Sequence, residues 1–167
     1  MRDFDVFMPT RIVFGETAEE KLGKYLQSYS SNILVVMGGQ SIRNIGLYDR
    51  IISHLSKFNI HFTELSGVMP NPKVDLVRQG ITMARDKEVT FILAVGGGSV
   101  IDTAKAIAAG YFYDGDVWEL FSQGKTVAKC LPVGVVLTVP GAGSETSNGG
   151  LFLMKKPERS LDSVIQI

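Results

Sequence analysis

The clearest structural signal in the sequence is Phe91-Ile-Leu-Ala-Val-Gly-Gly-Gly-Ser-Val-Ile-Asp-Thr-Ala-Lys-Ala-Ile-Ala108. Its first five residues form a continuous apolar run of strand length, typical of a strand buried on both faces. Three glycines follow, and apolar residues then recur at helical spacing, at positions 100, 101, 104, 107 and 108. Ser99 and Asp102 match the capping-box pattern, so we expect Ser99 to cap the helix. The stretch therefore predicts a strand, a glycine turn and a helix.

A turn of this kind can bind an anion. Backbone N–H groups and the helix dipole favour negative charge at a helix N-terminus, and glycines let a phosphate approach the backbone. A tight turn without a ligand is the alternative, but three consecutive glycines cost more backbone entropy than such a turn requires. The sequence contains neither the P-loop pattern nor G-x-G-x-x-G. We expect Gly96, Gly97, Gly98 and Ser99 to bind a nucleotide phosphate.

Composition limits the classes of function. The 17 acidic and 17 basic residues cancel, which leaves no charge footprint for nucleic acid or an anionic membrane. No apolar run reaches the length of a membrane-spanning helix, and the N-terminus is not that of a signal peptide. Cys130 is the single cysteine and excludes a disulfide framework, so we expect a cytoplasmic protein. His54 and His61 lack the spacing and the acidic partners of a metal site.

Strand and helix patterns alternate along the chain. We expect strands at 11–14, 33–37, 61–65, 91–95 and 133–139, and helices at 16–29, 47–57, 74–84, 99–113 and 118–121. This alternation predicts an α/β fold with a doubly wound, mostly parallel sheet, in which ligands bind beyond the carboxyl ends of the strands. Glycine turns at 38–39, 96–98 and 141–143 lie at such ends and should meet in one nucleotide site. We assign residues 1–147 to a dinucleotide-binding domain and 148–167 to a tail with room for one strand.

Five ordered segments resemble one enzyme family. Gly96-Gly-Gly-Ser-x-x-Asp102-x-x-Lys105 is similar to the nucleotide-binding signature of iron-dependent alcohol dehydrogenases, whose fold is Rossmann-like and shared with dehydroquinate synthase. The other segments are Pro9-Thr-Arg-Ile-Val-Phe-Gly15, Gly38-Gly-x-Ser41 ending at Gly46-Leu-Tyr-Asp49, Pro70-Asn-Pro72 and Thr138-Val-Pro-Gly-Ala-Gly-Ser-Glu145. They span about 150 residues, and the chain resembles the butanol dehydrogenases of this family.

The resemblance implies a set of dinucleotide contacts. Gly39 aligns with an acidic position of NAD-preferring relatives, and Ser41 with Arg43 nearby resembles the NADP-using butanol dehydrogenases, so we expect NADP, with NAD as the alternative. Arg43 is equally well explained as a solvated cation at a helix start. Asn71 should lie by the adenine ribose, on a backbone that its flanking prolines hold extended. The implied cofactor-binding residues are Gly38, Gly39, Ser41, Asn71, Gly96, Gly97, Gly98, Ser99, Asp102, Thr138, Val139, Gly141 and Ala142.

The same resemblance implies functions that this sequence does not carry. Family members hold iron or zinc through one Asp and three His of a second, all-helical domain, and no residue here matches those ligands or a catalytic acid or base. We expect the cofactor-binding portion of an enzyme acting on a small alcohol or aldehyde. A non-catalytic NADP-binding module and a dehydroquinate synthase-like lyase remain alternatives. Apolar residues at 151–153, together with a tail strand at 164–167, predict a homodimer.

Overall fold

The chain folds around a four-stranded parallel sheet of order β2-β1-β3-β4. The structure is a computed structural model that describes residues 10–141, 143–147, 149–153 and 162–166. Each connection from one strand of this sheet to the next along the chain contains a helix, as parallel strands require. The strands are β1 (Asn32–Met37), β2 (His61–Leu65), β3 (Phe91–Gly96) and β4 (Val133–Leu137). The predicted doubly wound α/β fold is therefore confirmed.

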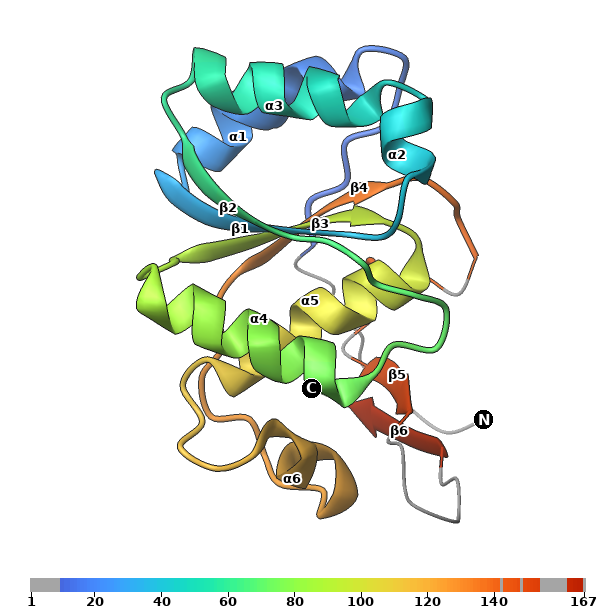
Figure 1. The fold of residues 1–167 in the computed structure, drawn as a ribbon. Coiled ribbons are helices and arrows are strands. Elements are labelled where there is room, and N and C mark those ends of the chain that lie inside the picture. Colours follow the sequence, from blue (N-terminus) through green and yellow to red (C-terminus); the bar gives the residue numbers. More distant parts are fainter. Residues whose placement is uncertain (1–9, 142, 148, 154–161, 167) are drawn as a thin grey trace, which may run out of the picture.

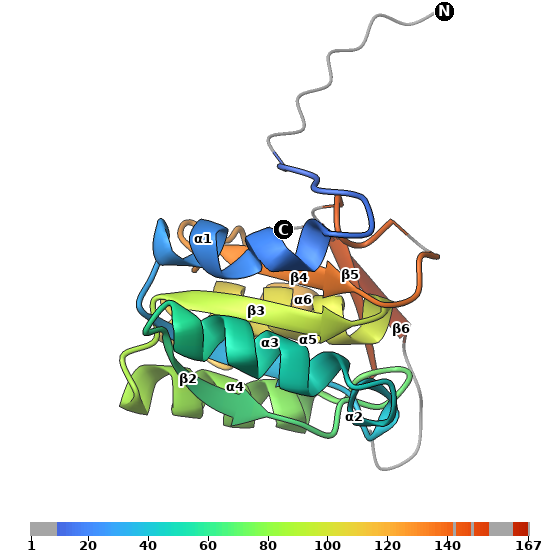
Figure 2. The ribbon, with the colours of Figure 1, turned by 90° about the horizontal axis from the view of Figure 1, so that it is seen from above.

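Helices cover both faces of the sheet, and they form the outer layers in Figure 1. One face carries the 3-10 helix η1 (Ala18–Lys21) with α1 (Leu22–Gln27), α2 (Ser41–Asn44) and α3 (Leu47–Lys57), seen from above in Figure 2. The other face carries α4 (Val74–Asp86) and α5 (Gly98–Gly110). Successive residues of β1 point to opposite faces, so Ile33 and Val35 join one core while Leu34 and Val36 join the other. This explains why β3 is apolar throughout and β1 is apolar after its first residue, Asn32.

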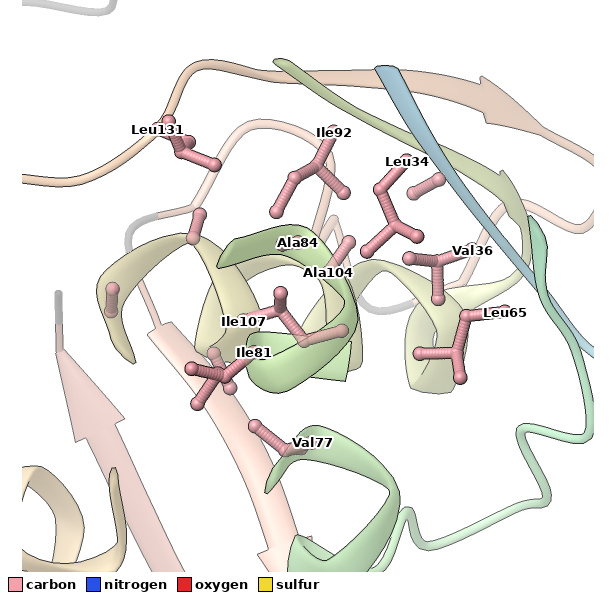
Figure 3. Packing of buried hydrophobic residues seen from close by; sticks show 14 of the residues in the cluster. Leu34, Val36, Leu65, Val77, Ile81, Ala84, Ile92, Ala104, Ile107 and Leu131 are labelled. Atoms are coloured by element: carbon pink, nitrogen blue, oxygen red, sulfur yellow. The ribbon is translucent and has the colours of Figure 1, made fainter. Parts of the chain in front are cut away.

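Close packing between α4 and α5 depends on glycines at their contact. A Cβ atom added at Gly80 would lie 2.4 Å from Cδ1 of Ile107, and one at Gly110 would lie 2.3 Å from Cδ1 of Ile81. Figure 3 shows Ile81 and Ile107 with Ala84 and Ala104 in this core. Small residues let the two helices approach each other while the isoleucines fill the space between them.

Two smaller elements follow the sheet. Helix α6 (Val117–Ser122) packs beside α4, and a two-stranded antiparallel sheet joins β5 (Gly149–Leu153) to β6 (Asp162–Gln166). Strand β5 contacts α5, and β6 contacts α6. Both strands of this second sheet lie within the segment predicted as a tail, and they pair with each other within the chain. The boundary proposed at residue 147 is not tested by this arrangement.

Several predicted boundaries were wrong. Residues 11–14 form no strand, and no described strand lies alongside to supply hydrogen bonds to them. The glycine turn therefore follows the third strand of the chain, not the fourth. The helix expected over 16–29 is shorter and begins as η1, and β4 ends at Leu137, which leaves Thr138 and Val139 in the turn.

Asp116 fastens α6 to the rest of the domain. Its carboxylate accepts a hydrogen bond from the Trp118 N–H at 2.8 Å, as an N-cap, and forms a two-pronged ion pair with Arg78 at 2.8 and 3.1 Å. Hydrogen bonding to Arg78 is the main reason why the pKa of Asp116 lies below its ordinary value. Because the folded-state pKa is lowered, the stabilisation is complete above about pH 4 and is lost as the pH falls through the folded-state pKa.

We therefore expect Asp116→Ala to lower the free energy of unfolding by about 1–2 kcal/mol at pH 7, since both the cap and an exposed ion pair are lost. Urea denaturation measures this loss, and the difference from the parent should shrink below about pH 4. Asp114→Ala, two residues earlier at an exposed position, is the matched control. Equal losses in the two variants at pH 7 would contradict the capping role.

Candidate functional site

The chain reverses direction within the sheet between β1 and β3. From β1 it passes through α3 to β2 at one side, and then through α4 to β3 at the opposite side of β1. Such a reversal opens a crevice beyond the carboxyl ends of the two strands, where doubly wound folds bind ligands. Gly38 follows β1 there, and Gly97 follows β3. The β4 turn is adjacent, since the Thr138 N–H donates to the carbonyl of Gly96 at 3.1 Å. The segments that follow β1, β3 and β4 thus lie side by side at one edge of the sheet.

Four glycines at this edge have no packing reason to be glycine. Apart from its chain neighbours and the local helix backbone, a Cβ atom added at Gly39, Gly98 or Gly141 would have no described atom within 4 Å, and one at Gly97 would lie 4.0 Å from Val139. None of the four has a positive φ angle that would favour glycine over other residues. Neither the fold nor the backbone conformation therefore requires them, whereas the close approach of a ligand to the backbone would.

Of the two neighbouring glycines, Gly96 has a packing reason. A Cβ atom at Gly96 would lie 2.6 Å from Cγ2 of Val100, whereas one at Gly38 would lie 3.5 Å from the carbonyl oxygen of Val68, which is an ordinary contact distance. Gly96 thus lets the first turn of α5 fold back onto the end of β3. Within the glycine run, a side chain at Gly96 would clash with α5, whereas side chains at Gly97 and Gly98 would meet open space.

Helix α5 begins without the predicted capping box. Gly97 is the N-cap residue, no side chain caps the helix, and Ser99 lies inside the first turn. The first N–H groups of any helix lack partners within the helix, so this N-terminus suits an anion on the glycine side. Asp102 does not take part in a capping box. Its carboxylate instead accepts a 2.5 Å hydrogen bond from the hydroxyl of Ser144.

That hydrogen bond belongs to a polar network between α5 and the turn after β4. The Lys105 ammonium group donates to Ser144 Oγ at 3.3 Å and to the carbonyl oxygen of Ser147 at 2.6 Å. Burial lowers the pKa of Lys105, and the carboxylates of Asp102 and Glu145 oppose this effect. Lys105 is therefore partly buried and holds the 144–147 segment against α5. The sequence pattern did not reveal this pairing, because Ser144 and Asp102 are 42 residues apart.

The other described residues predicted for the site lie in the segments that follow β1, β2 and β4. Ser41 is exposed at the start of α2, Thr138 is partly buried, and Val139 is 66% exposed. Ala142 lies outside the described residues. The loop that contains Asn71 reaches the end of β1, since the Gly67 N–H donates to the carbonyl of Gly38 at 3.1 Å. Asn71 is exposed, but its φ of 56° is left-handed, so the expected extended backbone is wrong. Asparagine tolerates this conformation better than most residues.

A charged cluster that the sequence did not predict lies beside α2. The Arg43 guanidinium group is 3.2 Å from Oε2 of Glu64 and stacks 3.6 Å above the Tyr48 ring. The Tyr48 hydroxyl donates to Glu64, and this hydrogen bond is the main reason why the pKa of Tyr48 is raised. Arg43 is thus held by two neighbours and is not a simple solvated cation.

Within the described residues, no group of three His, Cys, Asp or Glu side chains is arranged to hold a metal ion. None of the described helices is long and apolar enough to span a membrane.

Comparison with known proteins identifies the family of this chain. The family model for iron-containing alcohol dehydrogenase matches residues 9–161. The chain belongs to this family. Among curated relatives, the probable NADH-dependent butanol dehydrogenase 1 of Bacillus subtilis is 44% identical over 152 residues, which are 91% of this chain and 39% of that protein. The NADPH-dependent aldehyde reductase YqhD of Escherichia coli is 35% identical over 159 residues, which are 93% of this chain and 40% of that protein.

Solved structures of iron-containing alcohol dehydrogenases share the fold. The NADH-dependent butanol dehydrogenase A of Thermotoga maritima matches with a TM-score of 0.93 and 35% identity, over 100% of this chain and 42% of that one. The chain therefore spans about two fifths of the length of the relatives it matches. Their names include both NADH-dependent and NADPH-dependent enzymes, so the relatives are nicotinamide dinucleotide-dependent oxidoreductases of both kinds.

Proposed function

We propose that this chain is the dinucleotide-binding portion of an NAD(P)-dependent alcohol dehydrogenase. The observation that carries the proposal is the set of four glycines, Gly39, Gly97, Gly98 and Gly141, that face open space at the sheet reversal. Backbone without side chains at this place suits a pyrophosphate and its two riboses. Family membership supports the same conclusion independently.

In this proposal, each turn contacts a different part of the dinucleotide. The Gly97–Ser99 backbone at the start of α5 holds the pyrophosphate, and Gly38, Gly39 and Ser41 lie beside the adenine ribose together with Asn71. Thr138, Val139 and Gly141, in the turn after β4, contact the cofactor from another side, and the family resemblance adds Ala142 to these contacts. Asp102 fixes this turn through Ser144, which supports a positioning role. When bound, the cofactor supplies hydride transfer, and the residues of this chain supply its orientation.

The choice between NADP and NAD is a finer proposal. Gly38 and Gly39 place no carboxylate where a ribose 2′-phosphate would be repelled, which favours NADP. The names of the relatives at 43–47% identity, which are NADH-dependent butanol dehydrogenases, favour NAD instead. We retain NADP as the prediction from the residues, and the titration described below decides between the two.

The rest of the activity is proposed from the family. We propose a small alcohol or aldehyde as the substrate, with iron or zinc held by residues outside this chain, where a metal would polarise the substrate oxygen. The single cysteine suits a reducing cytoplasm. Elemental analysis of the dialysed chain tests the metal assignment, and one tightly bound metal ion per chain would contradict it.

A homodimer is a further part of the proposal. Ile12 and Phe14 expose 69% and 98% of their surfaces, and apolar surface of this kind favours association. Sedimentation of the chain at increasing concentration should show a dimer. A monomer over the whole concentration range would contradict the proposal.

Isothermal titration of the 167-residue chain with NADH and NADPH tests the proposed function, with AMP as a control ligand. We expect one dinucleotide to bind per chain, more tightly than AMP, because the pyrophosphate provides contacts that AMP lacks. If the chain binds neither dinucleotide, or binds both no better than AMP, the assignment of the site is wrong. Aldehyde-dependent oxidation of NADPH separates an enzyme from a non-catalytic binding module.

A further inference from the structure

The cluster of Arg43, Tyr48 and Glu64 lies beside the adenosine end of the proposed site. Arg43 belongs to α2, which begins two residues after Gly39, and its N–H donates to the carbonyl of Gln40 at 3.0 Å. Glu64 is the penultimate residue of β2 and pairs in register with Val35 of β1, close to the carboxyl end of the sheet. In Figure 1, α2 stands at this end of the sheet, directly after β1.

Arg43 is the basic residue of α2 and is the one placed to meet a phosphate on the adenine ribose. In doubly wound folds, an arginine near the end of this strand accommodates the 2′-phosphate of NADP. In this chain the guanidinium group already has two partners. It forms an ion pair with Glu64 at 3.2 Å and stacks on the Tyr48 ring at 3.6 Å. The Tyr48 hydroxyl donates to the same carboxylate, so Glu64 orients both of its neighbours.

We propose that Glu64 determines cofactor selectivity by competing with the ribose 2′-phosphate for Arg43. This inference rests on the proposed dinucleotide site. A phosphate carries more charge than a carboxylate and accepts paired hydrogen bonds from a guanidinium group, so it can displace Glu64. The Arg43 and Glu64 side chains are 40% and 29% exposed, and ion pairs at such positions are weak. The competition therefore reduces NADPH affinity without preventing binding, and it leaves NADH unaffected because NADH has no 2′-phosphate.

The decisive variant is Glu64→Gln. Glutamine has the same shape and keeps an oxygen that accepts from Tyr48, but it removes the charge that holds Arg43. We expect NADPH to bind about fivefold more tightly to this variant, which is the range of a weak exposed ion pair, and NADH to bind as it does to the parent. Isothermal titration with both dinucleotides measures the two affinities, and thermal melting confirms that the variant keeps its fold.

Arg43→Met and the double variant show whether Glu64 acts through Arg43. Arg43→Met should weaken NADPH binding alone, and adding Glu64→Gln should then give little further gain. An equal gain from Glu64→Gln with and without Arg43, or unchanged NADPH affinity in the single variant, would overturn the inference while leaving the dinucleotide site intact. If no variant binds either dinucleotide, both the inference and the proposed function are wrong.

Discussion

The Gly97→Val variant is expected to lose dinucleotide binding by about 100-fold or more while it keeps the parent fold. Gly97 has φ −92° and ψ −169°, an extended conformation that valine adopts readily, and an added Cβ atom has no described neighbour closer than 4.0 Å. The branched side chain would instead occupy the space in which the pyrophosphate meets the start of α5. Titration calorimetry measures the affinity, and urea denaturation measures the stability.

Gly96→Ala is the matched contrast one residue earlier. Its Cβ atom would lie 2.6 Å from Cγ2 of Val100, so we expect a loss of about 1–3 kcal/mol in the free energy of unfolding. Gly97→Val should therefore reduce dinucleotide affinity, whereas Gly96→Ala should reduce the free energy of unfolding. Unchanged binding in the Gly97 variant would show that the pyrophosphate lies elsewhere, and an unfolded Gly97 variant would show that the space at this position has been misjudged.

Gly39→Asp is expected to reverse a preference for NADPH, weakening NADPH binding by about 30-fold. Gly39 is exposed, and nothing described lies within 4 Å of an added Cβ atom, so the aspartate fits without repacking. Its carboxylate would repel a 2′-phosphate and could accept hydrogen bonds from an unmodified ribose, which should maintain or improve NADH binding. Competitive titration with the two dinucleotides gives the ratio of their affinities.

Gly39→Asn separates the charge from the size of the new side chain. Asparagine occupies nearly the same volume, so NADPH binding to this variant should stay close to that of the parent. If asparagine and aspartate weaken NADPH equally, the effect is steric and the residue does not sense the 2′-phosphate. An unmodified chain that prefers NADH would contradict the NADP prediction and would agree with the names of its relatives.

The sequence predicted best those helices and strands whose pattern is complete within one continuous stretch of residues. The Phe91–Gly96 strand and the helix after it could be recognised because an apolar run and a helical period lie in one stretch. The end of β4 was misplaced by two residues, because Thr138 and Val139 are β-branched like the strand before them, whereas the pairing in register with β3 ends at Leu137. The segment at 11–14 has a strand-like composition, but a strand also needs a neighbour, and composition does not reveal one.

Predictions about side chains failed where distant residues compete for them. Ser99 and Asp102 have the spacing of a capping box, yet Asp102 accepts from Ser144, which only the folded chain brings near. The sequence did not decide whether Arg43 is a solvated cation or a phosphate ligand, because its partner Glu64 lies 21 residues away on strand β2. The glycine turns were predictable because a parallel sheet places the ends of its strands together, whatever the side chains around them do.

Amide chemical-shift mapping by NMR with added dinucleotide tests the central claim most directly. If the dinucleotide lies at the sheet reversal, the largest shifts should fall on the amides of Gly39, Gly97, Gly98, Ser99 and Gly141, while those of α6 stay in place. The Gly97→Val variant should lose these shifts. Shifts that centre on α1 or α6, or an unperturbed Gly97–Ser99 backbone at saturating dinucleotide, would contradict the account.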